Sequence, residues 1–191
     1  MVDDKIAELG EFQWNDEESE DKLKGTGHGV AGRREEILLP TKEKYIGELG
    51  SSGNRHGRGT QIWPDGARYD GYFMNDSKEG YGRIIHGDGD VYIGYWTNDR
   101  SNGKGKYIHT DGAYYDGDWV EDKHHGFGKE QWADLAVFEG EYRNGKKHGH
   151  GRFTWPDGSS FDGDFINNKM EGLGLYKWID GRVYDGDWFD N

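Results

Sequence analysis

Residues 138–161 read FEGEYRNGKKHGHGRFTWPDGSSF, and this stretch decides the fold. It opens with an aromatic residue, a glycine and a second aromatic residue at alternate positions, Phe138, Gly140 and Tyr142. A period of two places all three on one face of a β-strand. Asn144-Gly145 follows, and Asn-Gly is the strongest short signal for a hairpin turn because both residues tolerate positive φ. The stretch therefore predicts a β-hairpin.

The return half of the stretch keeps the same alternation. Gly149 and Gly151 form a Gly-x-Gly pair. Phe153 and Trp155 occupy the next two alternate positions, and Asp157-Gly158 then predicts a turn toward the next hairpin. A glycine on a strand face leaves a hole that a ring from a neighbouring strand can fill. Because glycine also weakens an isolated strand, such a hairpin needs neighbours stacked beside it.

These three motifs recur along the chain in one phase. The aromatic-x-Gly-x-apolar motif starts seven times, and successive starts lie 24 residues apart once and 23 residues apart five times. The Gly-x-Gly pair occurs in six units, and Asp-Gly closes five of them, with Asp134-Leu135 in its place in the fourth unit. The predicted structural residues are the first aromatic residue and the glycine of each opening motif: Tyr45, Gly47, Tyr69, Gly71, Tyr92, Gly94, Tyr115, Gly117, Phe138, Gly140, Phe161, Gly163, Tyr184 and Gly186. Such a period predicts a repeat architecture.

We therefore predict an all-β fold, an elongated, solenoid-like single sheet in which consecutive hairpins form an antiparallel meander. The array spans residues 45–191, with repeats that start at residues 45, 69, 92, 115, 138 and 161 and a half repeat at 184–191. Residues 1–44 are expected to form an acidic, largely extended or disordered tail, in which Phe12 and Trp14 pair onto the edge of the first repeat as a cap. A closed barrel or sandwich is the alternative, but such folds do not hold one phase over six units.

Composition excludes several classes of function. The formal net charge is −13, to which residues 1–44 contribute 12 acids and 7 bases (−5) and residues 45–191 contribute 25 acids and 17 bases (−8). Neither part forms the basic patch that nucleic acid requires, and an anionic membrane surface is disfavoured for the same reason. The chain has no cysteine, which excludes disulfides and thiolate zinc sites. The N-terminal sequence lacks the basic and apolar regions of a signal peptide, which favours a cytoplasmic location.

The three motifs, at this spacing and in this order, resemble the MORN (membrane occupation and recognition nexus) repeat. The resemblance covers six units from Tyr45 to about Gly181 and a half unit at 184–191, and it departs from the pattern at Leu49 and at Asp134-Leu135-Ala136. It implies a single-sheet hairpin solenoid with a groove and a role as a scaffold for other proteins, often in cytoskeletal or ciliary assemblies such as radial-spoke heads. It also implies two alternatives, because some members are linked to membrane phospholipids and others precede an enzymatic domain such as a lipid kinase or a methyltransferase.

The candidate binding surface is aromatic. A single-layer sheet cannot bury both of its faces, so part of the ring surface should be exposed, and exposed aromatic surface usually marks a binding site. An amphipathic helix or an extended segment fits a groove of this kind. The opposing interpretation is that curvature and twist let the rings cover one another. The predicted partner-binding groove consists of Trp63, His86, Tyr107, His109, Trp132, Phe153, Trp155, Tyr176 and Trp178.

Two other sequence patterns resemble a nucleotide-binding loop and a catalytic acid pair, but each has a simpler structural interpretation. Residues 27–32 fit Gly-x-Gly-x-x-Gly, but a charged stretch precedes them where a dinucleotide loop needs an apolar strand. The acid pairs recur in every repeat and predict a solvated face, whereas a glycosidase site is one asymmetric pair. These pairs are Asp116/Asp118, Glu139/Glu141 and Asp162/Asp164.

Histidines cluster at four positions, and imidazole clusters can bind zinc or nickel. The four are His124, His125, His148 and His150. His125 and His148 lie one period apart, which places them in one column of the repeat and explains them without a metal.

These observations predict a non-catalytic scaffold or adaptor, with no catalytic residue, cofactor or metal. Its partners are expected to be other proteins within a multi-subunit assembly, in the cytoskeleton or in a cilium or axoneme. The alternatives are a phospholipid-recognition module and the regulatory repeat fragment of a larger enzyme such as a lipid kinase. An open strand at the C-terminal edge also favours self-association there.

Overall fold

The structure is a computed structural model that describes residues 2–14 and 34–191. The chain divides into two compact units, Met1–Gly103 (unit 1) and Lys104–Asn191 (unit 2). One helix, α1 (Val2–Leu9), precedes fourteen strands. The strands are β1 (Arg34–Leu38), β2 (Lys44–Leu49), β3 (Arg55–Ile62), β4 (Arg68–Met74), β5 (Ser77–Ile85), β6 (Val91–Thr97), β7 (Arg100–Ile108), β8 (Tyr114–Val120), β9 (Lys123–Gln131), β10 (Val137–Arg143), β11 (Lys146–Thr154), β12 (Ser160–Ile166), β13 (Lys169–Lys177) and β14 (Val183–Trp188). Among the described residues, no helix is long and apolar enough to cross a membrane.

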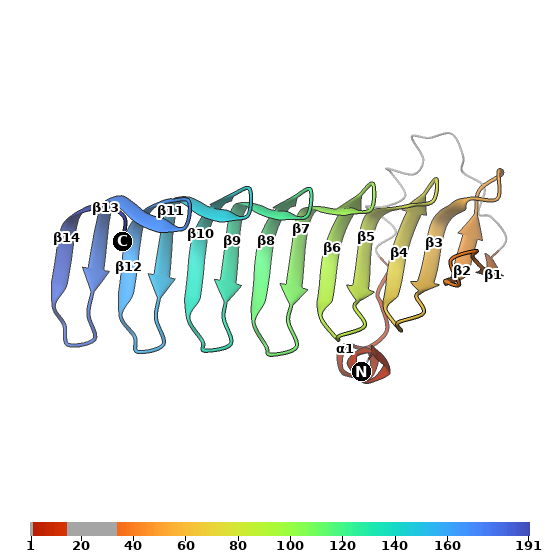
Figure 1. Ribbon diagram of the computed structural model, residues 1–191, viewed down its shortest axis with the longest axis horizontal. Helices are drawn as coiled ribbons and strands as arrows, with labels where there is room; N and C mark the ends of the chain where they lie inside the picture. Colours follow the sequence, from red (N-terminus) through yellow and green to blue (C-terminus); the bar gives the residue numbers. More distant parts are fainter. Residues whose placement is uncertain (1, 15–33) are drawn as a thin grey trace. The chain divides into compact units, whose positions relative to one another are not determined.

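The strands form one sheet in which their order equals their order in the chain, β1 to β14 (Figure 1). The pairing within both units is antiparallel, as between β4 and β5 and between β10 and β11. The predicted all-β antiparallel meander of hairpins is therefore confirmed.

The motif glycines pair with one another across the strands. Gly71 of β4 is the cross-strand partner of Gly82 of β5, and Gly140 of β10 is the partner of Gly151 of β11. A Cβ atom added to Gly140 would lie 2.5 Å from the Cα atom of Gly151, and one added to Gly71 would lie 2.8 Å from the Cα atom of Gly82. The strands approach too closely for any side chain at these positions, which explains why glycine recurs there.

Rings fill the space that the glycines leave, on what we call the glycine face of the sheet. In unit 2, Phe138 contacts Tyr142 and Phe165 with ring centroids 5.3 and 5.0 Å apart, and both pairs are edge-to-face. Tyr69 makes the same contacts with Phe73 and Trp96 in unit 1, at 5.2 and 5.5 Å. Edge-to-face contact is favourable for aromatic rings, so the core of each unit is a chain of interlocking rings.

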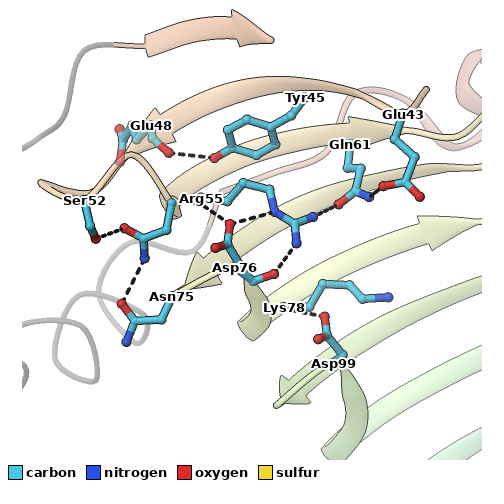
Figure 2. Close-up of polar contacts among 11 residues, drawn as sticks. Glu43, Tyr45, Glu48, Ser52, Arg55, Gln61, Asn75, Asp76, Lys78 and Asp99 are labelled. Carbon is cyan, nitrogen blue, oxygen red and sulfur yellow. Dashed lines mark hydrogen bonds and ion pairs between the residues drawn. The ribbon is translucent and has the colours of Figure 1, made fainter. Parts of the chain in front are cut away.

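Within each unit, hairpin turns bind the preceding hairpin at a residue 21 positions earlier in the chain. The Asp76 carboxylate accepts a hydrogen bond from the backbone N–H of Arg55 at 2.8 Å, and the Asp76 N–H donates to the Arg55 carbonyl at 3.0 Å (Figure 2). Asn168 makes the same two bonds to Lys147 in unit 2, at 2.8 and 3.0 Å. Asp76 and Asn168 have φ of 72° and 74°, a conformation that aspartate and asparagine tolerate better than most residues. These side chains both form the turn and link consecutive hairpins.

The segment before Tyr45 contains regular structure that the sequence analysis did not predict. Val2–Leu9 forms α1, and β1 pairs with β2 beside the first repeat. The expected position of Phe12 and Trp14 at the edge of the first repeat is wrong. Because β1 occupies that edge, Phe12 and Trp14 pack instead on rings of β4 and β5. The acidic run at 16–21 and the glycine-rich stretch at 27–32 lie outside the described residues.

Candidate partner-binding surface

The glycine face carries two classes of ring. The motif rings, such as Phe138 and Phe161, are fully buried. The predicted groove residues lie on the same face, further along each return strand, and they are half-buried or exposed. We call the seven of them in unit 2 the ring row: Tyr107, His109, Trp132, Phe153, Trp155, Tyr176 and Trp178.

Five residues of the ring row form a continuous chain of contacts. Trp132 contacts Phe153 with ring centroids 5.3 Å apart, and Phe153 contacts Trp155 at 4.6 Å. Trp155 then contacts Tyr176 at 5.2 Å, and Tyr176 contacts Trp178 at 4.6 Å. Three of these four pairs are tilted, at interplanar angles of 42° to 50°. Both expectations about the rings hold in part, because the rings cover one another and yet leave a partly exposed aromatic surface.

The other groove residues are arranged as follows. Tyr107 and His109 contact each other at 4.8 Å and line one small cavity with Trp132, Tyr115 and Glu130. In unit 1, Trp63 lies 5.6 Å from the Lys78 ammonium group. His86 is half-buried in unit 1.

A cation and a carboxylate lie against the ring row and were not included in the predicted groove. The Lys147 ammonium lies 4.5 Å from the centre of the Trp132 ring and 3.3 Å from Glu130 Oε2. The Tyr142 hydroxyl donates a 2.8 Å hydrogen bond to the same Glu130 oxygen. Burial, together with the Glu130 charge, raises the pKa of Tyr142 well above its usual range. A sequence signal existed, because Glu130 is the single acid in its repeat column.

His124 belongs to the aromatic core beneath this surface. Its ring is stacked on Tyr115 with centroids 3.6 Å apart and planes 3° from parallel. Burial lowers the pKa of His124 to about 4, against a partial opposing effect of the Glu130 charge. At neutral pH the imidazole is therefore uncharged and packs as an aromatic ring.

The clustered histidines do not converge on one point. His124 packs in the glycine face, whereas the His150 ring lies 3.1 Å from Asp162 and 3.4 Å from Asp164 on the opposite face. His125 and His148 are half-buried. Within residues 2–14 and 34–191, no group of three potential metal ligands comes together.

The acid pairs form a solvated ladder with bases on the opposite face of unit 2. Lys104 lies 2.7 Å from Asp118, and Lys129 lies 3.8 Å from Glu139. Exposed ion pairs of this kind contribute little to stability, and a repeated ladder offers no unique catalytic position. The interpretation as a solvated face agrees with this geometry.

Comparison with known proteins identifies the repeat. The model of the MORN repeat matches residues 45–68, 69–91, 92–114, 115–136, 138–160 and 161–181. The chain belongs to the MORN-repeat family. The matches begin at the six predicted repeat starts, 45, 69, 92, 115, 138 and 161.

The MORN chain matches no curated protein. Among solved structures, it is similar to the TCP domain of Drosophila melanogaster SAS-4 in complex with a proline-rich motif of Ana2, with a TM-score of 0.45, 11% identity, and coverage of 84% of this chain and 94% of that one. It is also similar to the TCP10 domain of Danio rerio CPAP, with a TM-score of 0.32, 15% identity and coverage of 80% and 94%. A virginiamycin B lyase from Staphylococcus aureus matches at a TM-score of 0.18 and 10% identity, with coverage of 82% and 70%. With TM-scores below 0.5 and identities below 25%, these likenesses say nothing about function.

Proposed function

We propose that this chain is a non-catalytic scaffold that binds a partner protein along the ring row, as an amphipathic helix or an extended segment. One observation supports this most directly: the contact chain from Trp132 to Trp178 lies on a sheet face and stays partly exposed. Aromatic residues give large contact areas at low entropic cost, and they are enriched among the residues that dominate binding energies. The Glu130–Lys147 pair adds a polar group that can fix the register of a bound segment.

The proposal extends to the place of action. Membership in the MORN-repeat family, whose members often act in cytoskeletal or ciliary assemblies such as radial-spoke heads, supports a role in such an assembly. Imaging of the tagged full-length protein in ciliated cells tests this part. A diffuse cytosolic signal, with no enrichment on microtubules or axonemes, would contradict it.

The ring row itself is tested with two double variants that differ only in the face they change. Trp132→Ala/Trp155→Ala removes two rings of the row, whereas Phe127→Ala/Leu173→Ala removes two exposed apolar side chains from the opposite face of the same unit. Both are first checked for a cooperative unfolding transition. Proximity labelling beside the wild type should show partners that are lost from the first variant and kept by the second. If a folded ring-row variant keeps every partner, the proposed surface is wrong.

The phospholipid alternative is separated by sedimentation with anionic vesicles at physiological salt. We expect no binding, because the array carries a net charge of −8 (17 bases against 25 acids). If the wild type binds the vesicles and Trp132→Ala/Trp155→Ala does not, the ligand of the ring row is a lipid surface and not a protein.

A further inference from the structure

The opposite face of the sheet breaks the repeat pattern in one place. The residue that follows the motif glycine points to this face, because successive side chains alternate along a strand. It is acidic in five units and tyrosine in two: Glu48, Tyr72, Tyr95, Asp118, Glu141, Asp164 and Asp187. Tyr81, the middle residue of a Gly-x-Gly pair, pairs with Tyr95 across the strands, and their ring centroids lie 5.4 Å apart. The second and third repeats therefore present an aromatic patch where the other units present acids.

The N-terminal segment of the chain covers this patch. The Phe12 ring stacks on Tyr81 at 5.8 Å, and the Trp14 ring meets Tyr72 edge-on at 5.7 Å. The Arg58 guanidinium lies 5.9 Å from the centre of the Trp14 ring. In Figure 1 the segment that leads away from α1 runs along β4 and β5. Tyr72 and Tyr81, which depart from the pattern of the other repeats, are thus the residues that contact this segment.

Arg83 joins the segment to the sheet. It is 3% exposed, its Nη1 donates a 2.8 Å hydrogen bond to the carbonyl of Gly10, and its guanidinium lies 5.8 Å from the centre of the Phe12 ring. The bases in the same column of unit 2 are less buried: Lys106 is half-buried, and Lys129 and Arg152 are exposed. The backbone pairing is the same in both units, so the difference comes from the cover by the segment and from the tyrosines beside Arg83.

Charge complementarity also favours binding of the N-terminal segment to this patch. Residues 2–14 contain four acids, at positions 3, 4, 8 and 11, and one base at position 5, which gives a net charge of −3. The charged residues at the patch are three arginines and two acids, a net charge of +1: Arg58, Arg68, Arg83, Asp70 and Glu48. The acids that occupy the corresponding column throughout unit 2 would repel such a segment.

The present occupant leaves part of the site unsatisfied. The Nε and Nη2 atoms of Arg83 are buried without a hydrogen-bond partner, although Nη2 lies 3.5 Å from Asp70 Oδ2. A carboxylate placed against Arg83 would make charge-assisted bonds that the Gly10 carbonyl does not provide. A partner segment with such a group can therefore compete with the chain's own segment.

We propose that the opposite face of the second and third repeats is a second binding site, specific for an acidic segment with an aromatic-x-aromatic pair, and that Gly10–Trp14 occupies it as a built-in competitor. The site is independent of the ring row, since it lies on the other face and in unit 1. Its ligand class follows from the patch itself: two rings spaced by one residue for Tyr72 and Tyr81, and negative charge for the arginines.

The test uses the full chain carrying Phe12→Ala/Trp14→Ala, which frees the site and leaves every residue of the patch intact. The probe is a dye-labelled peptide of residues 2–14, followed by fluorescence anisotropy at low salt. The variant should bind the peptide at least tenfold more tightly than the wild type, whose own segment competes. Binding should weaken as salt rises.

Controls define the site. The peptide with both aromatic residues changed to alanine should not bind. Adding Tyr72→Asp, which gives the second repeat the acid that unit 2 has in this column, should abolish binding, whereas adding Phe127→Ala in unit 2 should leave it unchanged. Equal binding by wild type and double variant, or no binding by a folded double variant, overturns the proposal.

A measurement on the wild type covers the case in which the double variant does not fold. Hydrogen exchange of α1 is followed with and without the unlabelled peptide at millimolar concentration, the order of the effective concentration of a tethered segment. Faster exchange of α1 supports displacement from the site. Unchanged exchange overturns it.

Discussion

The second and third repeats and the fourth to sixth repeats share one face and differ on the other. On the glycine face, both groups bury motif rings over paired glycines, with Tyr69 over Gly71 in one and Phe161 over Gly163 in the other. On the opposite face, Tyr72 is 2% exposed beneath the N-terminal segment, whereas Phe127 is 54% exposed and Leu173 is 65% exposed. Packing on the glycine face therefore requires the same residue types in every repeat. The opposite face has no such requirement, so its residues can differ between repeats and serve a separate function.

The largest effect should be the same in both groups, because it concerns the shared face. Gly71→Ala and Gly163→Ala each place a Cβ against the facing glycine, 2.8 Å from the Cα of Gly82 and 2.5 Å from the Cα of Gly174. Each should lower the free energy of unfolding by about 3 kcal/mol, since the strands cannot separate without breaking the ladder. Urea denaturation measures the loss, and hydrogen exchange shows which unit is affected.

Gly66→Ala is the matched control for these variants. Nothing lies within 4 Å of a Cβ at this turn position, and its φ of 89° alone should cost about 1 kcal/mol. If Gly71→Ala and Gly163→Ala cost no more than this control, close approach of the strands is not the reason for the glycines.

The next effect should differ between the groups. Arg83→Ala removes a buried base beside Asp70, which is itself buried, although Arg68 still lies 2.8 Å from that carboxylate. The free energy of unfolding should fall by about 2 kcal/mol, below the full cost of an unpaired buried charge. Arg152→Ala, in the same column of unit 2, should change it by less than about 0.5 kcal/mol because the side chain is exposed. Similar losses in urea denaturation would show that the covering segment has no energetic consequence.

The smallest effect is a pH dependence expected in unit 2. The pKa of His124 is about 4 in the folded chain and near 6.5 when unfolded, so the unfolded state binds more protons between these values. Stability should therefore fall as the pH is lowered from 6.5 to 4, by about 1–2 kcal/mol once partial exposure is allowed for. The corresponding column of unit 1 holds Arg55, Lys78 and Ser101, and therefore no histidine.

His124→Gln isolates this contribution from the carboxylates that titrate in the same range. The difference in unfolding free energy between wild type and variant should shrink or change sign as the pH falls below 6.5. His150→Gln, at an exposed position of the opposite face, should follow the wild type. A difference that stays constant from pH 7 to pH 4 would refute the assignment of the pH response to His124.

The sequence by itself determined the repeat and its sheet. The alternation of Tyr69 with Gly71 and the phase held over six units are local rules of strand geometry, so they could be predicted without tertiary information. The nine predicted groove residues were assigned to one face in the same way, as columns of the repeat, and their role in binding stays a prediction. Glu130 shares a column with Tyr107, Phe153 and Tyr176, so its face could be assigned from the period. Its ion pair with Lys147, and the contact of Lys147 with Trp132, could not be predicted, because they depend on which strands lie side by side and how they twist.

Only the tertiary structure decided where the N-terminal segment lies. Phe12 and Trp14 stand outside the period, and no local rule relates them to Tyr81 and Tyr72 roughly sixty to seventy residues later. The burial of Arg83 follows from that contact, although its column also holds exposed bases. Periodic packing is encoded in neighbouring residues, whereas a docked segment is selected by the shape and charge of a surface that exists only after the sheet has formed.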